Sequence, residues 1–506
     1  MNFCINCGVA QTANAKFCNS CGTVVSARTA APTADASARA EHPVPVAVQP
    51  PPASAAGTLP PAEGQRPAAF AALPVSDYIR DGLAAFFLIA SLFMVWQYAV
   101  WPDLDASISA TRIDVILITL LSLASLGIPY LWRAGVFGTG WNYAKTQDAR
   151  ILANAPYFVM VIVYLITAMV ASAASDQLDT LVLGPAVAFG LAGAVLAAQP
   201  RSAELAPGDV RRDKRWVAIA LGFAGIIALF TIVQILELLL QASLRYASPL
   251  IVIIMGAASA AILAIVALKV AQADSSWRLV GIGLGVTAAV FGMLSLSPQI
   301  TLIQVDFDGG SPAFSFTFWI AFGAVIAAPS LDRLTKPAAS GAAPWLKAVR
   351  TVLTVAIGLN ALMGVVSIIA LIEAIVGESG YFAFYSPIPW VVALFFGVIG
   401  VVGGIIVRAM LSKDVREGLM LTTGYAALMA GLGLVLVILW SVQHLEGISP
   451  LTMLIAFAVP LGLVVLLWGP QSVRQHFASL PSAAGAAASG FSFAGAGSTE
   501  QPGPAE

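Results

Sequence analysis

Charge is the scarcest feature of this sequence. Only 10% of its 506 residues are Asp, Glu, Lys or Arg and 59% are hydrophobic, whereas a typical globular chain is roughly 25% charged. The mean hydropathy is +0.87. This composition excludes a soluble enzyme, a collagen-like chain and a disordered scaffold. The apolar runs are long and solid, which excludes an outer-membrane barrel, whose strands alternate apolar and polar residues.

Residues that carry catalysis are also scarce. The three histidines are scattered, at His42, His444 and His476, and form no cluster. The sequence contains no P-loop, no G-x-S-x-G elbow and no H-E-x-x-H motif. The apolar runs hold no acid pair, Ser/His pair or metal site of the kind that an intramembrane protease needs. We therefore expect a protein that is not an enzyme.

Cysteine occurs only at the amino terminus. The segments Phe3–Gly8 and Phe17–Gly22 both read F-C-x-x-C-G. Four thiolates from two such pairs can close a tetrahedral Zn²⁺ shell. The predicted ligands are Cys4, Cys7, Cys18 and Cys21. Zinc binding would supply the folding energy of so short a segment, about 10–16 kcal/mol.

Two redox-active pairs or a disulfide staple are the alternatives for these cysteines. A redox C-x-x-C motif normally opens a helix in a thioredoxin-like βαβ unit, and the surrounding sequence has no such pattern. The sequence therefore favours one structural zinc per chain.

The doubled motif, over residues 3–22, resembles the short zinc-ribbon module at the amino terminus of many bacterial membrane proteins. The resemblance implies a closed four-cysteine site that contacts a protein partner in the cytosol and performs no catalysis. Lys16 is the only basic residue in 1–25, so we expect no nucleic acid as partner. The whole design looks like uncharacterised multi-pass membrane proteins of Ala-rich bacteria, and 82–470 resembles no characterised family.

The chain divides into six parts. A Pro- and Ala-rich stretch cannot bury enough surface to fold and follows the ribbon as a disordered tether. The expected parts are a zinc ribbon (1–25), a disordered linker (26–77), three membrane units (78–200, 201–331 and 332–470) and a disordered tail (471–506). The first 80 residues lack the apolar stretch of a cleavable signal, so we expect the first apolar run to insert uncleaved.

We predict an all-α polytopic membrane protein with about twelve transmembrane helices, since about twelve apolar runs are long enough to cross the bilayer. The expected spans are 82–101, 113–132, 154–174, 178–198, 216–240, 248–271, 278–297, 312–331, 350–376, 388–411, 418–441 and 450–469.

The distribution of basic residues predicts the orientation of these spans. With the amino terminus inside, all of the 25 Lys and Arg residues except Arg112 and Arg245 fall on the cytoplasmic side. We therefore expect a multi-pass protein of the cell (inner) membrane, embedded in the lipid bilayer, with both termini in the cytoplasm. The reducing cytosol would keep the ribbon thiolates free to bind zinc.

The membrane region shows a weak internal repeat. Spans one, five and nine begin near 82, 216 and 349, and Pro200, Pro329 and Pro470 end the three units. We interpret this as three parallel copies of a four-helix unit. Chance periodicity in an apolar sequence is the alternative.

Three carboxylates lie near the outer ends of first helices, and no ionisable residue lies mid-span. Asp103, Glu237 and Glu373 could form a ring at an outer vestibule. They could instead face lipid headgroups or water. The sequence favours a membrane scaffold or sensor with a zinc-ribbon adaptor, and the alternative is a transporter or channel for a neutral or lipidic substrate.

The predicted orientation can be tested with cysteines engineered into 133–150 and 298–311. An impermeant thiol reagent added to intact cells should label only the second segment, because the two are predicted to face opposite sides. Labelling of both, or of neither until the cells are lysed, would contradict the orientation.

Overall fold

The computed structural model describes a helical body and a short amino-terminal hairpin. The hairpin pairs β1 (Asn2–Phe3) antiparallel with β2 (Ala10–Gln11). It belongs to the compact unit Met1–Pro60, and the helices belong to the unit Pro61–Glu506. The described residues are 2–3, 10–11, 73–101, 104–109, 113–138, 140–174, 181–205, 210–241, 247–294, 313–335, 341–376, 386–442 and 450–479.

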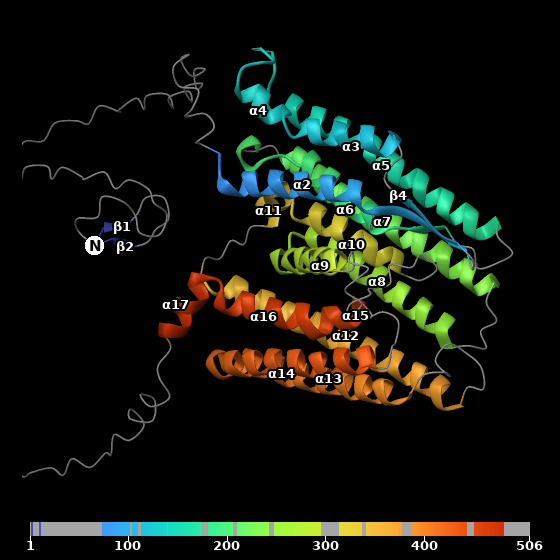
Figure 1. The fold of residues 1–506 in the computed structure, drawn as a ribbon. Helices are drawn as coiled ribbons and strands as arrows, with labels where there is room; N and C mark the ends of the chain where they lie inside the picture. The colour runs from blue at the N-terminus through green and yellow to red at the C-terminus, as the bar shows by residue number, and fades with distance from the viewer. Residues whose placement is uncertain are drawn as a thin grey trace, which may run out of the picture. The chain divides into compact units, whose positions relative to one another are not determined.

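The long helices fall into three consecutive groups of four, which we call the first, second and third bundles (Figure 1). The first bundle contains α2 (Val75–Phe93), α3 (Ile113–Ser125), α5 (Tyr143–Ala174) and α6 (Pro185–Ala198). The second contains α7 (Val210–Gln241), α8 (Ala247–Ala271), α9 (Ser275–Leu294) and α10 (Ala313–Ile326). The third contains α12 (Ala343–Val376), α13 (Ile388–Lys413), α14 (Val415–Val442) and α16 (Val459–Trp468).

Short helical segments complete the chain. One of them, α4, follows α3, and a four-residue helix with a π-helical turn leads into α16. The short segments are α4 (Ile128–Arg133), η1 (Ser202–Glu204), α11 (Pro329–Thr335), α15 (Pro450–Met453), η3 (Leu454–Ala458) and α17 (Gln471–Ser479). Three prolines that the sequence places at the unit ends lie at these segments: Pro200 lies two residues before η1, Pro329 begins α11, and Pro470 directly precedes α17.

Each bundle packs its helices in the same cyclic order. The first helix contacts the second and the fourth, and the third helix also contacts the second and the fourth. Consecutive helices are therefore neighbours around a shared core, as in an up-and-down bundle. The bundles adjoin one another in chain order: α6 packs on α10, and α12 packs on α8 and α9.

Nine helices in the described residues are long and apolar enough to cross a membrane, against the twelve predicted. The expected spans 82–101, 178–198 and 312–331 correspond to α2, α6 and α10, which do not qualify. The helices α6 and α10 have 14 residues each, about 21 Å at 1.5 Å per residue. The first seven residues of α2 include Asp77, Arg80 and Asp81, which breaks its apolar run.

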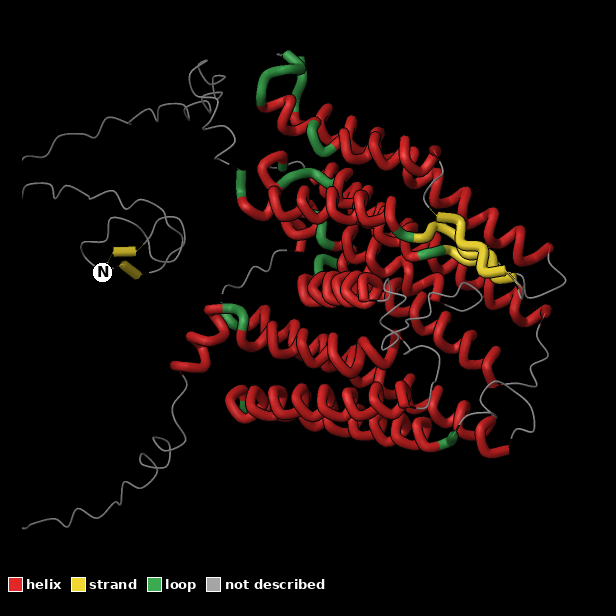
Figure 2. Tube along the Cα trace, viewed as in Figure 1, coloured by secondary structure: helices red, strands yellow, loops and turns green. Residues whose placement is uncertain are grey.

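A three-stranded antiparallel sheet, absent from the sequence-based prediction, shortens two of these helices (Figure 2). The central strand β3 (Val95–Trp101) pairs with β4 (Leu104–Ser109) and β5 (Leu181–Leu183). The sequence V-W-Q-Y-A-V-W is rich in β-branched and aromatic residues, which favour strands. The Trp96 indole donates a hydrogen bond of 3.0 Å to the Ser91 carbonyl at the end of α2. The chain after Phe93 therefore continues as a strand, where we expected a helix up to 101.

The helix α6 lies at the centre of the packing. All of its 14 residues are buried, because α2, α3 and α5 cover it within the first bundle and α10 covers it from the second. A helix that is apolar on every face is buried by neighbouring helices. Gly193 lets the backbone of α6 approach α2: a Cβ there would lie 2.9 Å from the Leu88 nitrogen.

Glycines at the G-x-x-x-G spacings 281/285 and 400/404 also let further helices approach closely. A Cβ on Gly285 would lie 2.6 Å from the Cα of Gly323, at the α9–α10 contact. A Cβ on Gly404 would lie 2.8 Å from the Ile357 side chain, where α12 meets α13.

Substitution of one of these glycines should loosen its helix pair. We expect Gly285→Ala to lower the free energy of unfolding by about 1–3 kcal/mol, because the added methyl overlaps backbone that cannot move aside. The matched control is Gly283→Ala on the same helix, where a Cβ meets nothing within 4 Å. Thermal unfolding in one detergent measures both, and equal midpoints would show that the α9–α10 contact is not tight.

Candidate functional site

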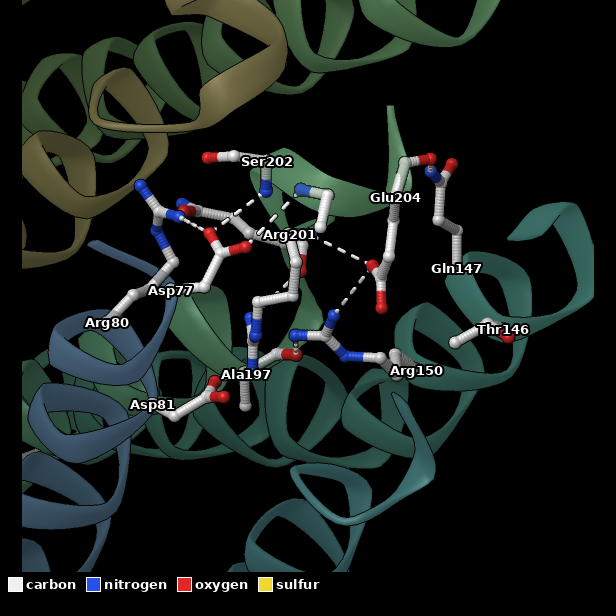
Figure 3. A network of polar contacts seen from close by, with 12 residues as sticks. Asp77, Arg80, Asp81, Thr146, Gln147, Arg150, Ala197, Arg201, Ser202 and Glu204 are labelled. Carbon is white, nitrogen blue, oxygen red and sulfur yellow. Dashed lines mark hydrogen bonds and ion pairs between the residues drawn. The ribbon is translucent and has the colours of Figure 1, made fainter. Parts of the chain in front are cut away.

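Charged side chains gather in a buried network at the end of the first bundle where the sequence predicts the cytoplasm (Figure 3). At its centre Arg150, on α5, is fully buried beside Glu204 of η1. A guanidinium nitrogen of Arg150 lies 3.2 Å from Glu204 Oε2. The same side chain donates to the carbonyl of Ala197 in the last turn of α6. Arg150 thus connects the third helix of the bundle to the carboxyl end of the fourth.

A second ion pair connects the segment after α6 to α2. Arg201 directly follows Pro200, and its guanidinium contacts the Asp81 carboxylate. Tyr130 of α4 donates a hydrogen bond of 2.5 Å to the other oxygen of Asp81. The backbone N–H of Arg201 donates to Glu204 Oε2 at 2.8 Å, so that one carboxylate oxygen joins both arginines.

Asp77 holds the same segment from the first turn of α2. Its carboxylate accepts backbone hydrogen bonds from Ser202 at 2.9 Å and Ala203 at 3.3 Å. Arg80, one turn further along α2, lies 3.4 Å from Asp77. Three carboxylates (Asp77, Asp81, Glu204) therefore face three guanidinium groups (Arg80, Arg150, Arg201), and the network is electrically balanced.

Burial changes the electrostatics of Arg201 without removing its charge. The desolvation of the guanidinium lowers the pKa of Arg201 to about 10, against the opposing attraction of Glu204 and Asp77. This pKa is still well above neutrality, so Arg201 is a cation at pH 7. The ion pairs are therefore present under ordinary conditions, and their geometry suits the fastening of helix ends rather than acid–base chemistry.

The second bundle repeats the central contact of this network. Arg278, near the start of α9, donates to the Ile326 carbonyl at 3.2 Å and to Asp332 at 2.5 Å. Ile326 lies three residues before Pro329, as Ala197 lies three residues before Pro200. The acids Asp332 and Glu204 both lie in the short segments after these prolines. In both bundles an arginine of the third helix thus joins the end of the fourth helix to the segment beyond it.

The first helix of the second bundle also carries a buried acid. Asp213, in the first turn of α7, accepts a hydrogen bond of 2.7 Å from Arg333 in α11. Asp77 occupies the corresponding turn of α2. The donors differ, since Asp77 accepts hydrogen bonds from backbone N–H groups and Asp213 accepts one from a side chain. Both acids nevertheless hold the segment that follows the fourth helix of their bundle.

The third bundle lacks these acids. The first two turns of α12 carry Lys347 and Arg350, and α17 carries Arg474 and no carboxylate. Lys347 pairs outward, with Asp274 between α8 and α9, at 2.9 Å. This ion pair fastens the third bundle to the second.

The structure places only one of the seven sequence-predicted site residues. Glu373, in α12, is 7% exposed. Glu237 lies in α7, but its side chain is outside the described part of the chain. The others, Cys4, Cys7, Cys18, Cys21 and Asp103, lie outside the described residues. In the part of the chain that is described, no group of three or more His, Cys, Asp or Glu could hold a metal ion.

Sequence analysis missed the ion network itself. The sequence-based prediction used Arg150 and Arg201 only as indicators of the cytoplasmic side, and it did not consider the acids beside them. The signal that could have found them is the spacing of the acids Asp77, Asp81, Glu204 and Asp332 close to arginines at helix ends, in a chain with very little charge.

The fold and the network define a multi-pass helical membrane protein whose helix ends are fastened by buried ion pairs. The chain belongs to the family described as a domain of unknown function, DUF7937, which matches residues 77–476. The matched region begins at Asp77 and ends within α17. No curated protein and no solved structure matches the chain.

The network predicts a large effect of removing one buried charge. We expect Arg150→Gln to reduce the free energy of unfolding by about 3–5 kcal/mol, because Glu204 would be left buried without its main partner. The control is Arg215→Gln, since Arg215 and its partner Asp148 are 48% and 50% exposed and such pairs contribute about 1 kcal/mol at most. Thermal or SDS-induced unfolding measures both variants. Equal losses of stability in the two would show that the buried ion pair contributes no more than the exposed one.

Proposed function

We propose that this protein is a non-enzymatic scaffold or sensor of the inner membrane, which carries a zinc-ribbon adaptor on its cytoplasmic side. The packing of α6 is the observation that carries this proposal. Every residue of α6, which contacts the other three long helices of the first bundle, is covered by neighbouring helices. An apolar helix that is buried on every side suits a body that anchors and positions other elements.

The adaptor part of the proposal is supported by the amino-terminal hairpin. The strands Asn2–Phe3 and Ala10–Gln11 pair antiparallel, and in the sequence Cys4 and Cys7 fall between them. Zinc knuckles present their paired thiolates from such connections. One Zn²⁺ held by Cys4, Cys7, Cys18 and Cys21 would fold the segment and leave no open coordination position.

We further propose that the body is built from three copies of one four-helix unit. The common packing order of the bundles and the matched contacts of Arg150 and Arg278 support this division. The third copy departs from the other two in its charges, as described above.

Transport of a neutral or lipidic substrate has one observation in its favour. Glu373 is buried near the carboxyl end of α12, and buried acids in membrane helices commonly line substrate paths. Glycerol equilibration into proteoliposomes, followed by light scattering, separates the two functions. A scaffold should match protein-free vesicles, whereas faster equilibration that Glu373→Gln abolishes would favour a transporter.

Metal analysis of the purified full-length protein tests the adaptor. We expect about one zinc per chain, lost in Cys4→Ser/Cys7→Ser because two thiolates cannot retain a structural site. Asn6→Ala is the matched control within the same motif and should keep the metal. The unfolding midpoint of the helical body should be the same in all three. Intact thiols without zinc in the wild-type protein would overturn the adaptor.

A further inference from the structure

The connection between α4 and α5 is rich in apolar and aromatic side chains. We call residues 131–143 the aromatic loop, and its large apolar members are Leu131, Trp132, Val136, Phe137, Trp141 and Tyr143. Val136 is 64% exposed, Leu131 45% and Tyr143 42%. Exposed apolar side chains that lie together mark contact with a partner or with a membrane.

A glycine turn holds Val136 in this exposed position. The N–H of Val136 donates to the Leu131 carbonyl at 3.1 Å, and Gly135 has a φ of +80°. This is the Schellman arrangement that ends a helix, with glycine in the left-handed conformation. The residue after the glycine commonly packs on the last turn of the helix. Here both Val136 and Leu131 remain largely exposed, so the turn presents apolar surface outward.

Contacts between rings fix the rest of the aromatic loop, of which only Thr139 lies outside the described residues. The rings of Phe137 and Trp141 stack with their centroids 4.6 Å apart. Trp132 and Tyr143 meet edge to face at 4.5 Å. The Trp132 indole donates to the Trp141 carbonyl at 3.3 Å, which joins the two halves of the loop. The loop therefore has a defined conformation in which its apolar side chains are already exposed.

The aromatic loop lies at the membrane surface because a candidate membrane span borders it on each side. These spans are Ile113–Arg133 and Tyr143–Thr167, and only residues 134–142 separate them. A closed turn of this length cannot carry its tip far from the headgroups. Figure 1 shows α4 and the loop after it at the edge of the first bundle, away from the second and third bundles. Lipid therefore borders the loop on that side.

Positive charge surrounds the same loop. Arg212 donates to the Ala144 carbonyl at 3.2 Å, which brings the basic start of α7 beside the first turn of α5. The two acids among these residues, Asp148 and Asp213, are each paired with an arginine. Tryptophan and tyrosine next to cations match the headgroup layer of a bilayer, which carries negative phosphates. The cations beside the loop are Lys145 on α5 and Arg211, Arg212, Lys214 and Arg215 on α7.

We propose that the aromatic loop inserts into the headgroup layer of the leaflet on the predicted cytoplasmic side, with Val136 foremost. The cations beside it then lie at the level of the lipid phosphates. Insertion would fix the depth of the first bundle in the bilayer at a point outside its membrane-spanning helices. The site requires neither the zinc ribbon nor a transport function, so its failure would leave the proposed function standing.

The depth of a spin label at position 136 tests the insertion. Val136 is replaced in the full-length protein by p-acetylphenylalanine, so that a nitroxide attaches there and the native cysteines remain unchanged. The protein is reconstituted into vesicles of dioleoyl phosphatidylglycerol and dioleoyl phosphatidylcholine. Collisions are measured with oxygen, which concentrates in the bilayer, and with a nickel chelate, which stays in water. We expect a depth of about 5–10 Å into the boundary between headgroups and acyl chains.

The matched control is a label at Glu417, beside the α13–α14 turn. This turn is the equivalent connection of the third bundle, and it carries Lys413 and Asp414 in place of aromatic residues. The ratio of oxygen to nickel collisions should be several-fold higher at 136 than at 417. A label at Phe395, which is 63% exposed within α13, gives the value for acyl chains.

Two results would overturn the proposal. A ratio at 136 equal to that at 417 would place the loop in water. A label shielded from both reagents would show that protein, such as the zinc ribbon or a cytosolic partner, covers the loop in place of lipid. A second label at the exposed Ala134 decides between these outcomes if the change at 136 prevents reconstitution.

Discussion

A charge at the edge of a bilayer can be buried in a protein only if an opposite charge and enough hydrogen bonds accompany it. The arrangement of the helix ends in this protein follows from that requirement. The last turn of a helix also leaves carbonyl groups without partners, and the side chains of Arg150 and Arg278 bond to such carbonyls while they pair with acids. One side chain thereby satisfies two demands. The proline after each of these helices turns the chain so that the required acid comes back to the arginine.

The helix-packing contacts and the charged helix ends contribute differently to the structure. Within the bilayer, water is absent and apolar burial does not distinguish one helix neighbour from another, so close contacts such as Gly285 against Gly323 select the neighbours. At the ends, ion pairs fix which segment lies beside which. Lys347 with Asp274 adds an ion pair to the helix packing that joins the second and third bundles.

Composition and periodicity were sufficient to predict a multi-pass helical body and the approximate position of most helices, because each long apolar run must satisfy its backbone within itself. The prediction failed where the residue types within an apolar run favour a strand or a helix start, although the run is long enough to cross the membrane as a helix. The run 82–101 carries no charged residue, but its last seven residues have the β-branched and aromatic character of a strand and pair with β4 and β5. The run 178–198 contains Pro185, which begins α6, so the first residues of that run lie outside the helix.

The ion network could not be predicted for a different reason. Its members come from segments that are more than fifty residues apart, such as Arg150 and Glu204, and no short motif connects them. Sequence analysis recognised the arginines as a statistical sign of orientation. Only the packing of α2, α5 and α6 shows that they are structural contacts with specific acids.

The shortness of α6 has a consequence for the order of membrane insertion. At about 21 Å, α6 is shorter than the roughly 30 Å of hydrocarbon that a lone helix must cross. Its apolar surface is completed by α10, and the Gln199 side chain just after α6 donates to the Ala324 carbonyl of α10 at 2.5 Å. During synthesis the ribosome must add more than a hundred further residues before that partner exists. The first bundle therefore remains unfinished while the second is being made, and a chain that stops before α10 leaves α6 as a substrate for membrane quality control.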